Sequence, residues 1–279
     1  MRVKVNKLPK SEVEIEGELP VEIFESYFAP ALKKLGGDLE VPGFRKGKAP
    51  ENILLANLGE MKILEEMATL ALSEHYPKII EEEKIEAIGL PAIGITKLAR
   101  GNPLGFKIKI AILPEVKLPD YKKIAKKVKS EISEADKKIE GSDEAKEKTR
   151  LRMVEGIIAE TSIDLPEVLV EVEISKMLYQ MESNISTMGL KFEDYLKHLN
   201  KTAEDIKNEL RGDAEKKAKL GLILNEIAKA EKLAADKEQV DREVAHILER
   251  YKDADPERAR LHAENVLANE KVFVFLENQ

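Results

Sequence analysis

The chain lacks several residue types, and each absence excludes a class of site. Its 279 residues include no cysteine and no tryptophan, and aromatic residues make up only 5%. Without thiols there can be no disulfide, thiolate metal site, iron–sulfur cluster or cysteine nucleophile, which is compatible with a reducing compartment. No apolar run approaches the roughly 18 residues that a membrane-spanning helix needs. The opening segment, MRVKVNKLPK, also lacks the apolar run of a secretory signal, so we expect no membrane partner.

Charged and apolar residues are both abundant. Hydrophobic residues make up 43% of the chain and charged residues 35%, a composition that favours packed helices and excludes disorder. The net charge is −7, so a general basic coat for nucleic acid is not expected. Residues 1–113 contain 16 basic and 17 acidic residues, whereas residues 114–279 contain 30 and 36. Any contact with a polyanion should therefore be local and lie in the first part.

The first part alternates between two hydrophobic periods. Apolar residues at three- and four-residue spacing predict helices over 23–35, 51–58 and 60–86. Pro30 is expected to kink the first helix, and Gly36-Gly37 to end it. Period-two alternation before and after these helices predicts strands. We therefore expect residues 1–113 to form an α+β domain, with a four-stranded antiparallel sheet and helices on one face. The alternating positions are Val3, Val5, Val13, Ile15, Ile93, Ile95, Phe106, Ile108, Ile110 and Ile112.

The second part is predicted to be helical to its end. Residues 114–144 contain two prolines and the basic run KKIAKKVK, and we expect them to form a linker or connecting arm. Residues 145–279 repeat apolar positions at helical spacing and predict an all-α domain. Capping residues mark three of the expected helix starts: Thr202 with Asp205, Asp236, and Asp255 followed by Pro256.

The most informative local signal is the segment from Pro42 to Pro50, PGFRKGKAP. Two glycines and two prolines exclude regular structure, so the segment should be a loop between two helices. It carries three positive charges and no negative charge, and Phe44 lies among them where no core pattern requires it. Such a loop suits a surface made of phosphates and protein together. Residue chemistry alone leaves open a solvated turn whose Phe44 folds back onto the sheet.

This segment resembles the ribosome-docking signature of trigger factor, a family of bacterial chaperones. Leu113-Pro114-Glu115-Val116 is similar to the end of that family's first domain, and the later helical segments occur in the family's order. The resemblance implies contact with a protein and rRNA at the ribosomal exit tunnel, and a cytoplasmic location. It assigns the contacts to Phe44, Arg45 and Lys46, the shape of the loop to Gly43 and Gly47, and an additional charge to Lys48.

One departure from the family is large. Trigger factors usually carry a prolyl-isomerase domain of FKBP type between the docking domain and the helices. Here the 35 residues 115–149 are highly charged and nearly free of aromatic residues, so the sheet and aromatic pocket of such a domain do not fit. We therefore predict no isomerase activity, no catalytic residue and no cofactor. The histidines are scattered and no HExxH sequence occurs, so no metal site is expected.

The helical domain is expected to hold unfolded or nascent polypeptides. Methionine adapts to varied partners, and Met153, Met177, Met181 and Met188 are candidates for this client-binding surface. The alternative is that these methionines fill ordinary gaps in the core. The overall hypothesis is an ATP-independent chaperone that docks on ribosomes, and a homodimer of the free form is compatible with it. Two other interpretations remain open: a holdase or assembly chaperone that does not use the ribosome, and a helical scaffold without clients.

Overall fold

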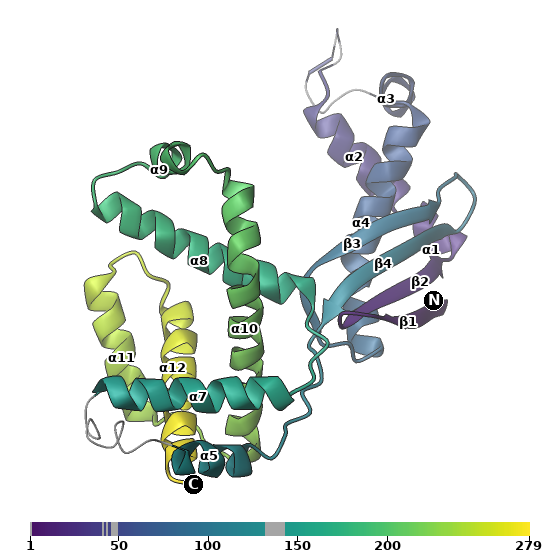
Figure 1. Ribbon diagram of the computed structural model, residues 1–279. Helices are drawn as coiled ribbons and strands as arrows, with labels where there is room; N and C mark the ends of the chain where they lie inside the picture. The colour runs from purple at the N-terminus through teal and green to yellow at the C-terminus, as the bar shows by residue number, and fades with distance from the viewer. Residues whose placement is uncertain (1, 41, 43, 46–49, 132–142) are drawn as a thin grey trace. The chain divides into compact units, whose positions relative to one another are not determined.

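The computed structural model describes residues 2–40, 42, 44–45, 50–131 and 143–279 (Figure 1). The chain forms two compact units. The first comprises Met1–Leu113 with Pro166–Val168, and the second comprises Pro114–Leu165 with Leu169–Gln279. Each unit has a hydrophobic core of its own.

The first unit contains a four-stranded antiparallel sheet, as the alternating apolar residues predict. Its strands are β1 (Arg2–Leu8), β2 (Glu12–Leu19), β3 (Ala87–Lys97) and β4 (Leu104–Ile112), in the order β1-β2-β4-β3. The register pairs Val5 with Ile15 and Ile15 with Ile108, and side chains of directly paired residues lie on the same face. Ile15 and Ile108 are fully buried, so this face of the sheet meets the core.

Helices cover the apolar face of the sheet. They are α1 (Val21–Glu25), α2 (Phe28–Asp38), α3 (Glu51–Leu58) and the long α4 (Glu60–Glu82), which runs behind the strands in Figure 1. Phe24 of α1 and Met67 of α4 are fully buried and share one cluster with Phe106 of the sheet. Burying side chains of this size contributes about 1.5–3 kcal/mol each. The predicted arrangement of helices on a four-stranded sheet is therefore confirmed.

The prediction of one kinked helix over 23–35 is wrong in detail. The chain forms two helices here, and Pro30 lies in the first turn of α2. The missing N–H of a proline costs little in a first turn, because those N–H groups have no partner within the helix. Gly36 does not end the helix, since α2 continues to Asp38. A Cβ at Gly36 would lie 2.7 Å from Leu54 Cδ1, so this glycine allows α2 and α3 to pack closely.

The second unit is mostly helical, as the repeating apolar positions predict. All three capping predictions are confirmed. Thr202 and Asp205 form a reciprocal capping box, Asp236 accepts from the backbone N–H groups of Glu238 and Gln239, and Asp255 accepts from that of Arg258. The helices are α5 (Tyr121–Ser130), α7 (Asp143–Glu160), α8 (Glu167–Thr187), α9 (Phe192–Leu199), α10 (Ala203–Ala230), α11 (Lys237–Arg250) and α12 (Pro256–Glu277).

The apolar packing of the second unit divides into a main core and two small clusters. The main core joins α5, α7 and the C-terminal halves of α10 and α12. Val240 and Val244 of α11 pack separately with Ala259 and Ala263 of α12. A third cluster joins α8 to α10 and buries little beyond Val170, Ile174 and Ala214. The unit therefore has a well-packed body and two thinly packed helical arms, one of α8 with the N-terminal half of α10 and one of α11 with α12.

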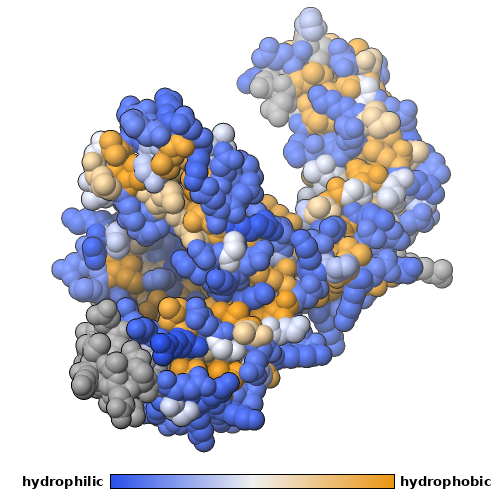
Figure 2. Space-filling model, in the orientation of Figure 1, coloured by the Kyte–Doolittle hydropathy of each residue, from blue (hydrophilic) through white to orange (hydrophobic). Residues whose placement is uncertain are grey.

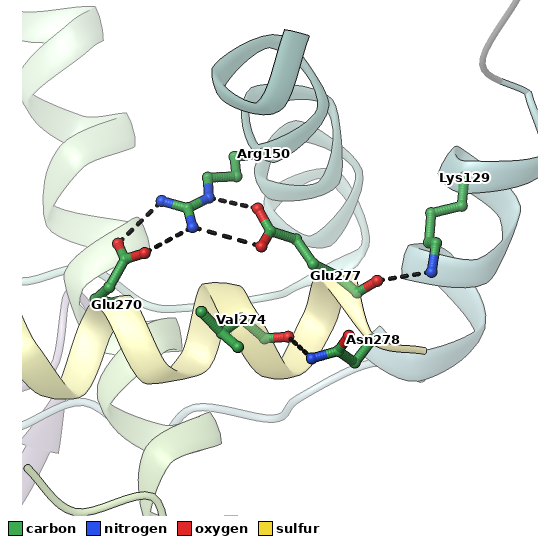
Figure 3. A network of polar contacts seen from close by, with 6 residues as sticks. All are labelled: Lys129, Arg150, Glu270, Val274, Glu277 and Asn278. Carbon is green, nitrogen blue, oxygen red and sulfur yellow. Dashed lines mark hydrogen bonds and ion pairs between the residues drawn. The ribbon is translucent and has the colours of Figure 1, made fainter. Parts of the chain in front are cut away.

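Ion pairs between α7 and α12 reinforce the body (Figure 3). The Arg150 guanidinium donates to both carboxylate oxygens of Glu270, at 2.9 and 2.7 Å, and its Nε lies 2.6 Å from Glu277 Oε1. The guanidinium also lies 5.2 Å from the centre of the Phe273 ring. The hydrogen bonds that Arg150 donates to Glu277, and then those to Glu270, raise the pKa of its guanidinium. These contacts hold α7 against the last turns of α12.

The segment expected to be a connecting arm contains a packed helix. Within residues 114–144, Ile124 and Ala125 of α5 are buried in the main core. Lys129 Nζ donates to the Glu277 carbonyl at 2.6 Å, which joins the end of α5 to the end of α12. Asp120 caps the start of α5 by accepting from the backbone N–H of Lys123. The described part of this segment therefore packs in the body of the second unit.

Candidate functional site

The basic loop joins α2 to α3 at one end of the first unit. Of its six candidate contact residues, Phe44 and Arg45 are described and both are exposed. Phe44 keeps 43% of its surface accessible, so its ring does not fold back into the core. Gly43, Lys46, Gly47 and Lys48 lie outside the described residues. The contact role of all six remains a prediction.

The base of this loop is held by the core of the first unit. Leu39, which follows α2 directly, packs against the core cluster that contains Leu54 of α3. Pro50 precedes α3, and its carbonyl accepts from the backbone N–H of Ile53 at 3.0 Å, which closes the first turn. Together with the close approach at Gly36, these contacts bring both ends of the loop to adjacent, well-packed helices. Phe44 and Arg45, which lie between these two packed helices in the sequence, are exposed to solvent.

The charge at the loop differs from that of the sheet. On the open face of the sheet, Lys107 Nζ lies 2.7 Å from Glu16 and Lys109 Nζ lies 2.6 Å from Glu12. The hydrogen bond from Lys107 lowers the pKa of Glu16, and the same contact raises that of Lys107. These lysines are therefore neutralised by the protein itself. Arg45, in contrast, pairs with no carboxylate of the described residues.

A second candidate surface lies on α8, α9 and the turn between them. Met188 is 76% exposed at the end of α8, whereas Met177 and Met181 are half-buried and Met177 packs against the small cluster beneath α8. Figure 2 shows apolar residues on the surface of this region and in the hollow of the second unit beside it. Large exposed apolar side chains extend the surface: Val172, Tyr179, Leu190 and Leu199.

The structure contradicts one candidate outright. Met153 is only 1% exposed and lies in the main core of the second unit with Ile157, Val272 and Leu276. It is buried because residues of α5, α10 and α12, which lie outside α7 in the sequence, share its core cluster and cover that face of α7. The alternative that this methionine fills a core position is therefore correct. Met153 cannot contribute to an open client-binding surface.

Pattern reasoning also missed part of the open surface. Val172 is 43% exposed and Tyr179 is 74% exposed. They are seven residues apart, two helical turns, and so lie on one stripe of α8. Ile174 and Ile185, on another face of the same helix, are buried. The stripe of Val172 and Tyr179 is visible in the sequence. It indicates an open surface, because a helix with two apolar stripes has more apolar surface than one partner can cover.

Two tyrosines with raised pKa values take part in structural contacts. Burial and a hydrogen bond to Glu231 raise the pKa of Tyr121 to about 12, and a hydrogen bond from Lys122 lowers that of Glu231. In the first unit, burial and Glu74 raise the pKa of Tyr27 to about 12. Within the described residues, no three acidic or histidine side chains gather to hold a metal. No helix of that part of the chain has the length and apolar character to cross a membrane.

Comparison with family models finds two matches. The model described as "Bacterial trigger factor protein (TF)" matches residues 1–141, which include the whole basic loop. The model for the C-terminus of the same family matches residues 122–273. The two matched ranges overlap, so no unmatched segment separates them.

Individual proteins are similar over different lengths. A trigger factor of Clostridium botulinum (strain Hall) is 23% identical over 396 aligned positions, which cover 92% of each chain. This chain has 279 residues, so at least 117 of those positions have no counterpart in it. A trigger factor of Rhodococcus opacus (strain B4) is 36% identical over 153 residues, 55% of this chain and 31% of its own.

The fold is shared with solved structures, one of which is a trigger factor. It is described as "Promiscuous Substrate Recognition in Folding and Assembly Activities of the Trigger Factor Chaperone". It matches over 100% of both chains with a TM-score of 0.66 and 15% sequence identity.

Proposed function

This chain belongs to the trigger factor family, and from that premise we propose that it is an ATP-independent chaperone that docks at the ribosomal exit tunnel. The docking site is the loop of residues 43–48. The observation that carries the proposal is the exposure of Phe44 beside Arg45 on a loop held by the core of the first unit. The partners are a ribosomal protein and rRNA at the tunnel exit, and the location is cytoplasmic.

The chemistry of the loop suits a composite surface. Arginine and lysine bind phosphate oxygens of RNA, and binding of this kind weakens as salt rises. The Phe44 ring fits a small apolar pocket on a protein, and burying it contributes about 1.5–3 kcal/mol. Because the rest of the chain is acidic, the loop is a local cationic contact and not part of a general polyanion surface. Such a contact is selective and reversible.

The second unit provides the surface for unfolded polypeptides. Met188 and Tyr179 present flexible and aromatic surface on an arm whose own core is thin. Dispersed apolar contacts of this kind bind many sequences weakly and release them without an energy source. The phrase "promiscuous substrate recognition", used of the solved trigger factor structure, describes the same behaviour, and we extend it to this chain. The free form can self-associate through the same surface.

We do not extend prolyl-isomerase activity to this chain. The two family matches overlap within residues 122–141, and the Clostridium relative has at least 117 aligned positions without a counterpart here. An FKBP-type domain of the usual family kind therefore has no segment to occupy between the matched parts. The activity that we propose is binding and shielding, with no chemical step.

The docking proposal is tested by the triple variant Phe44→Ala, Arg45→Ala, Lys46→Ala. We expect it to be lost from the ribosomal pellet in co-sedimentation, with wild-type binding weakening as salt is raised. The matched control is Arg250→Ala, Tyr251→Ala, Lys252→Ala. It removes the same kinds of side chain, one aromatic, one arginine and one lysine, from an exposed segment of the second unit. Tyr251 is 58% exposed, so this variant leaves both cores intact.

Three outcomes distinguish the hypotheses. If the triple variant pellets with ribosomes as well as the control does, the docking claim is wrong. If wild type ignores ribosomes yet suppresses aggregation of a denatured test protein, the chain is a ribosome-independent holdase or assembly chaperone. If it does neither, the chain is a helical scaffold. A prolyl-isomerase assay on a short peptide should give only background, and a higher rate would contradict the missing-domain argument.

A further inference from the structure

Strand β3 forms one edge of the sheet in the first unit. The strand order is β1-β2-β4-β3, and β3 pairs with β4 alone among the described strands. The other side of β3 therefore carries main-chain N–H and C=O groups that no neighbouring strand of the described residues takes up. An open edge of this kind is a template for a further strand.

The two edges of the sheet differ in how they discourage such pairing. Edge strands usually carry charged residues, prolines or bulges that block an additional strand. β1 carries Arg2, Lys4 and Lys7, whereas β3 has no charged residue before Lys97. Pro91 and the shift of register between Ile88 and Ala92 interrupt the first half of β3. The second half, Ala92–Thr96, has neither charge nor proline, and its one shift of register lies at its end, between Ile95 and Lys97.

The side chains of this second half continue the core face of the sheet. Ile93 pairs with Ile108 and Ile95 pairs with Phe106, so the members of each pair lie on the same face. Ile108 and Phe106 are buried, but Ile93 is 45% exposed and Ile95 is 43% exposed. The helices that cover the sheet therefore leave an apolar strip uncovered beside the open edge.

We propose that the outer edge of Ala92–Thr96 binds an extended, apolar segment of an unfolded polypeptide as an additional strand. The main chain of the segment pairs with β3, and its apolar side chains cover Ile93 and Ile95. Main-chain pairing is independent of sequence, and alternate side chains select for apolar segments. The inference rests on the proposed chaperone function and adds a client contact in the first unit, which the family resemblance does not assign.

A second copy of this chain is a less suitable occupant. Five residues of strand span only about 17 Å at roughly 3.3 Å per residue. Pairing over this length buries far less than the approximately 1,200 Å² of a stable protein interface. A short contact suits a client that must be released, and it adds to the weak contacts of the second unit by acting on the same polypeptide.

Amide hydrogen exchange of the full chain tests the proposal, with a reduced and alkylated, permanently unfolded protein as the probe. We expect exchange at 92–96 to slow when the probe is added. The variant Ile93→Glu, Ile95→Glu should abolish this protection and weaken probe binding about three- to tenfold, because it removes two cross-strand contacts. The variant Ile93→Thr, Ile95→Thr keeps β-branched side chains and should weaken binding in the same direction, which guards against misfolding of the charged variant.

The matched control is Ala92→Thr, Gly94→Thr, which places uncharged, β-branched side chains on the opposite face of the same strand. These positions pair with Lys109 and Lys107, which already form ion pairs with Glu12 and Glu16, and the control adds no charge to the edge. A Cβ at Gly94 would contact only the Lys107 carbonyl, at an ordinary 3.8 Å. We expect the control to bind the probe and to retain protection at 92–96.

The outcomes separate this inference from the proposed function. Protection that appears without probe and grows with the concentration of the chain identifies a second copy as the occupant and overturns the inference. Unchanged exchange at 92–96, in a protein that still suppresses aggregation of the probe, overturns the inference and leaves the chaperone function standing. Failure of wild type to suppress aggregation at all refutes the chaperone function, and the client contact with it.

Discussion

Replacing Met153 by alanine should destabilise the second unit by about 2–5 kcal/mol. The thioether tail is 1% exposed and packs with Ile157, Val272 and Leu276, each exposed by 2% or less. Truncation removes that tail from the core and leaves a cavity beside α7 in the main core, and both effects lower the free energy of unfolding. The same substitution at Met188, which is 76% exposed, should change that free energy by no more than about 0.5 kcal/mol.

Calorimetry measures this contrast directly. For a unit of this size, each kcal/mol shifts the melting midpoint by about 2–4 °C, so Met153→Ala should melt roughly 4–20 °C earlier. The two units can unfold in separate transitions. The shift is therefore read from the transition of the second unit, which substitutions in the first unit leave unchanged.

The substitution that costs more stability should cost less chaperone activity. At a temperature where both variants are folded, Met153→Ala should suppress aggregation of a denatured test protein as well as wild type does. Met188→Ala, combined with Tyr179→Ala, should suppress it less. A cost below about 1 kcal/mol at Met153, or an equal cost at Met188, would refute the assignment of one methionine to the core and the other to the surface.

Two further predictions concern polar contacts of the body. A hydrogen bond from Lys122 lowers the pKa of Glu231 from its ordinary value of 4.5, so the stabilisation from this pair is full above that value and is lost as pH falls through the lowered pKa. The difference in melting midpoint between wild type and Glu231→Gln should therefore be present at pH 7 and shrink below about pH 4.5, and a difference independent of pH would contradict this. Arg150→Lys keeps the charge but loses the bidentate contact with α12, so urea titration should show a loss of about 1–3 kcal/mol, and an unchanged midpoint would count against it.

The basic loop was the part of the candidate site most open to prediction. Its glycines, prolines and charges are contiguous, so their joint effect on the backbone and on local charge is visible in the residues themselves. The helix starts at Thr202, Asp236 and Asp255 were predictable for the same reason, since a capping side chain acts on an N–H two or three residues away. The sheet followed from alternation of apolar residues, because the period of a strand is a local property.

Other features depended on elements far apart in the chain. Whether Met153 or Met188 is open to solvent depends on whether other helices cover it, and α5, α10 and α12 form the core around Met153. Gly36 resembled a helix stop but serves the close packing of Leu54, a contact that no local pattern encodes. Local interactions therefore made the elements and the loop predictable from the amino acids alone. Burial is a relation between distant residues, so only the packed fold decided which apolar side chains remain available to another polypeptide.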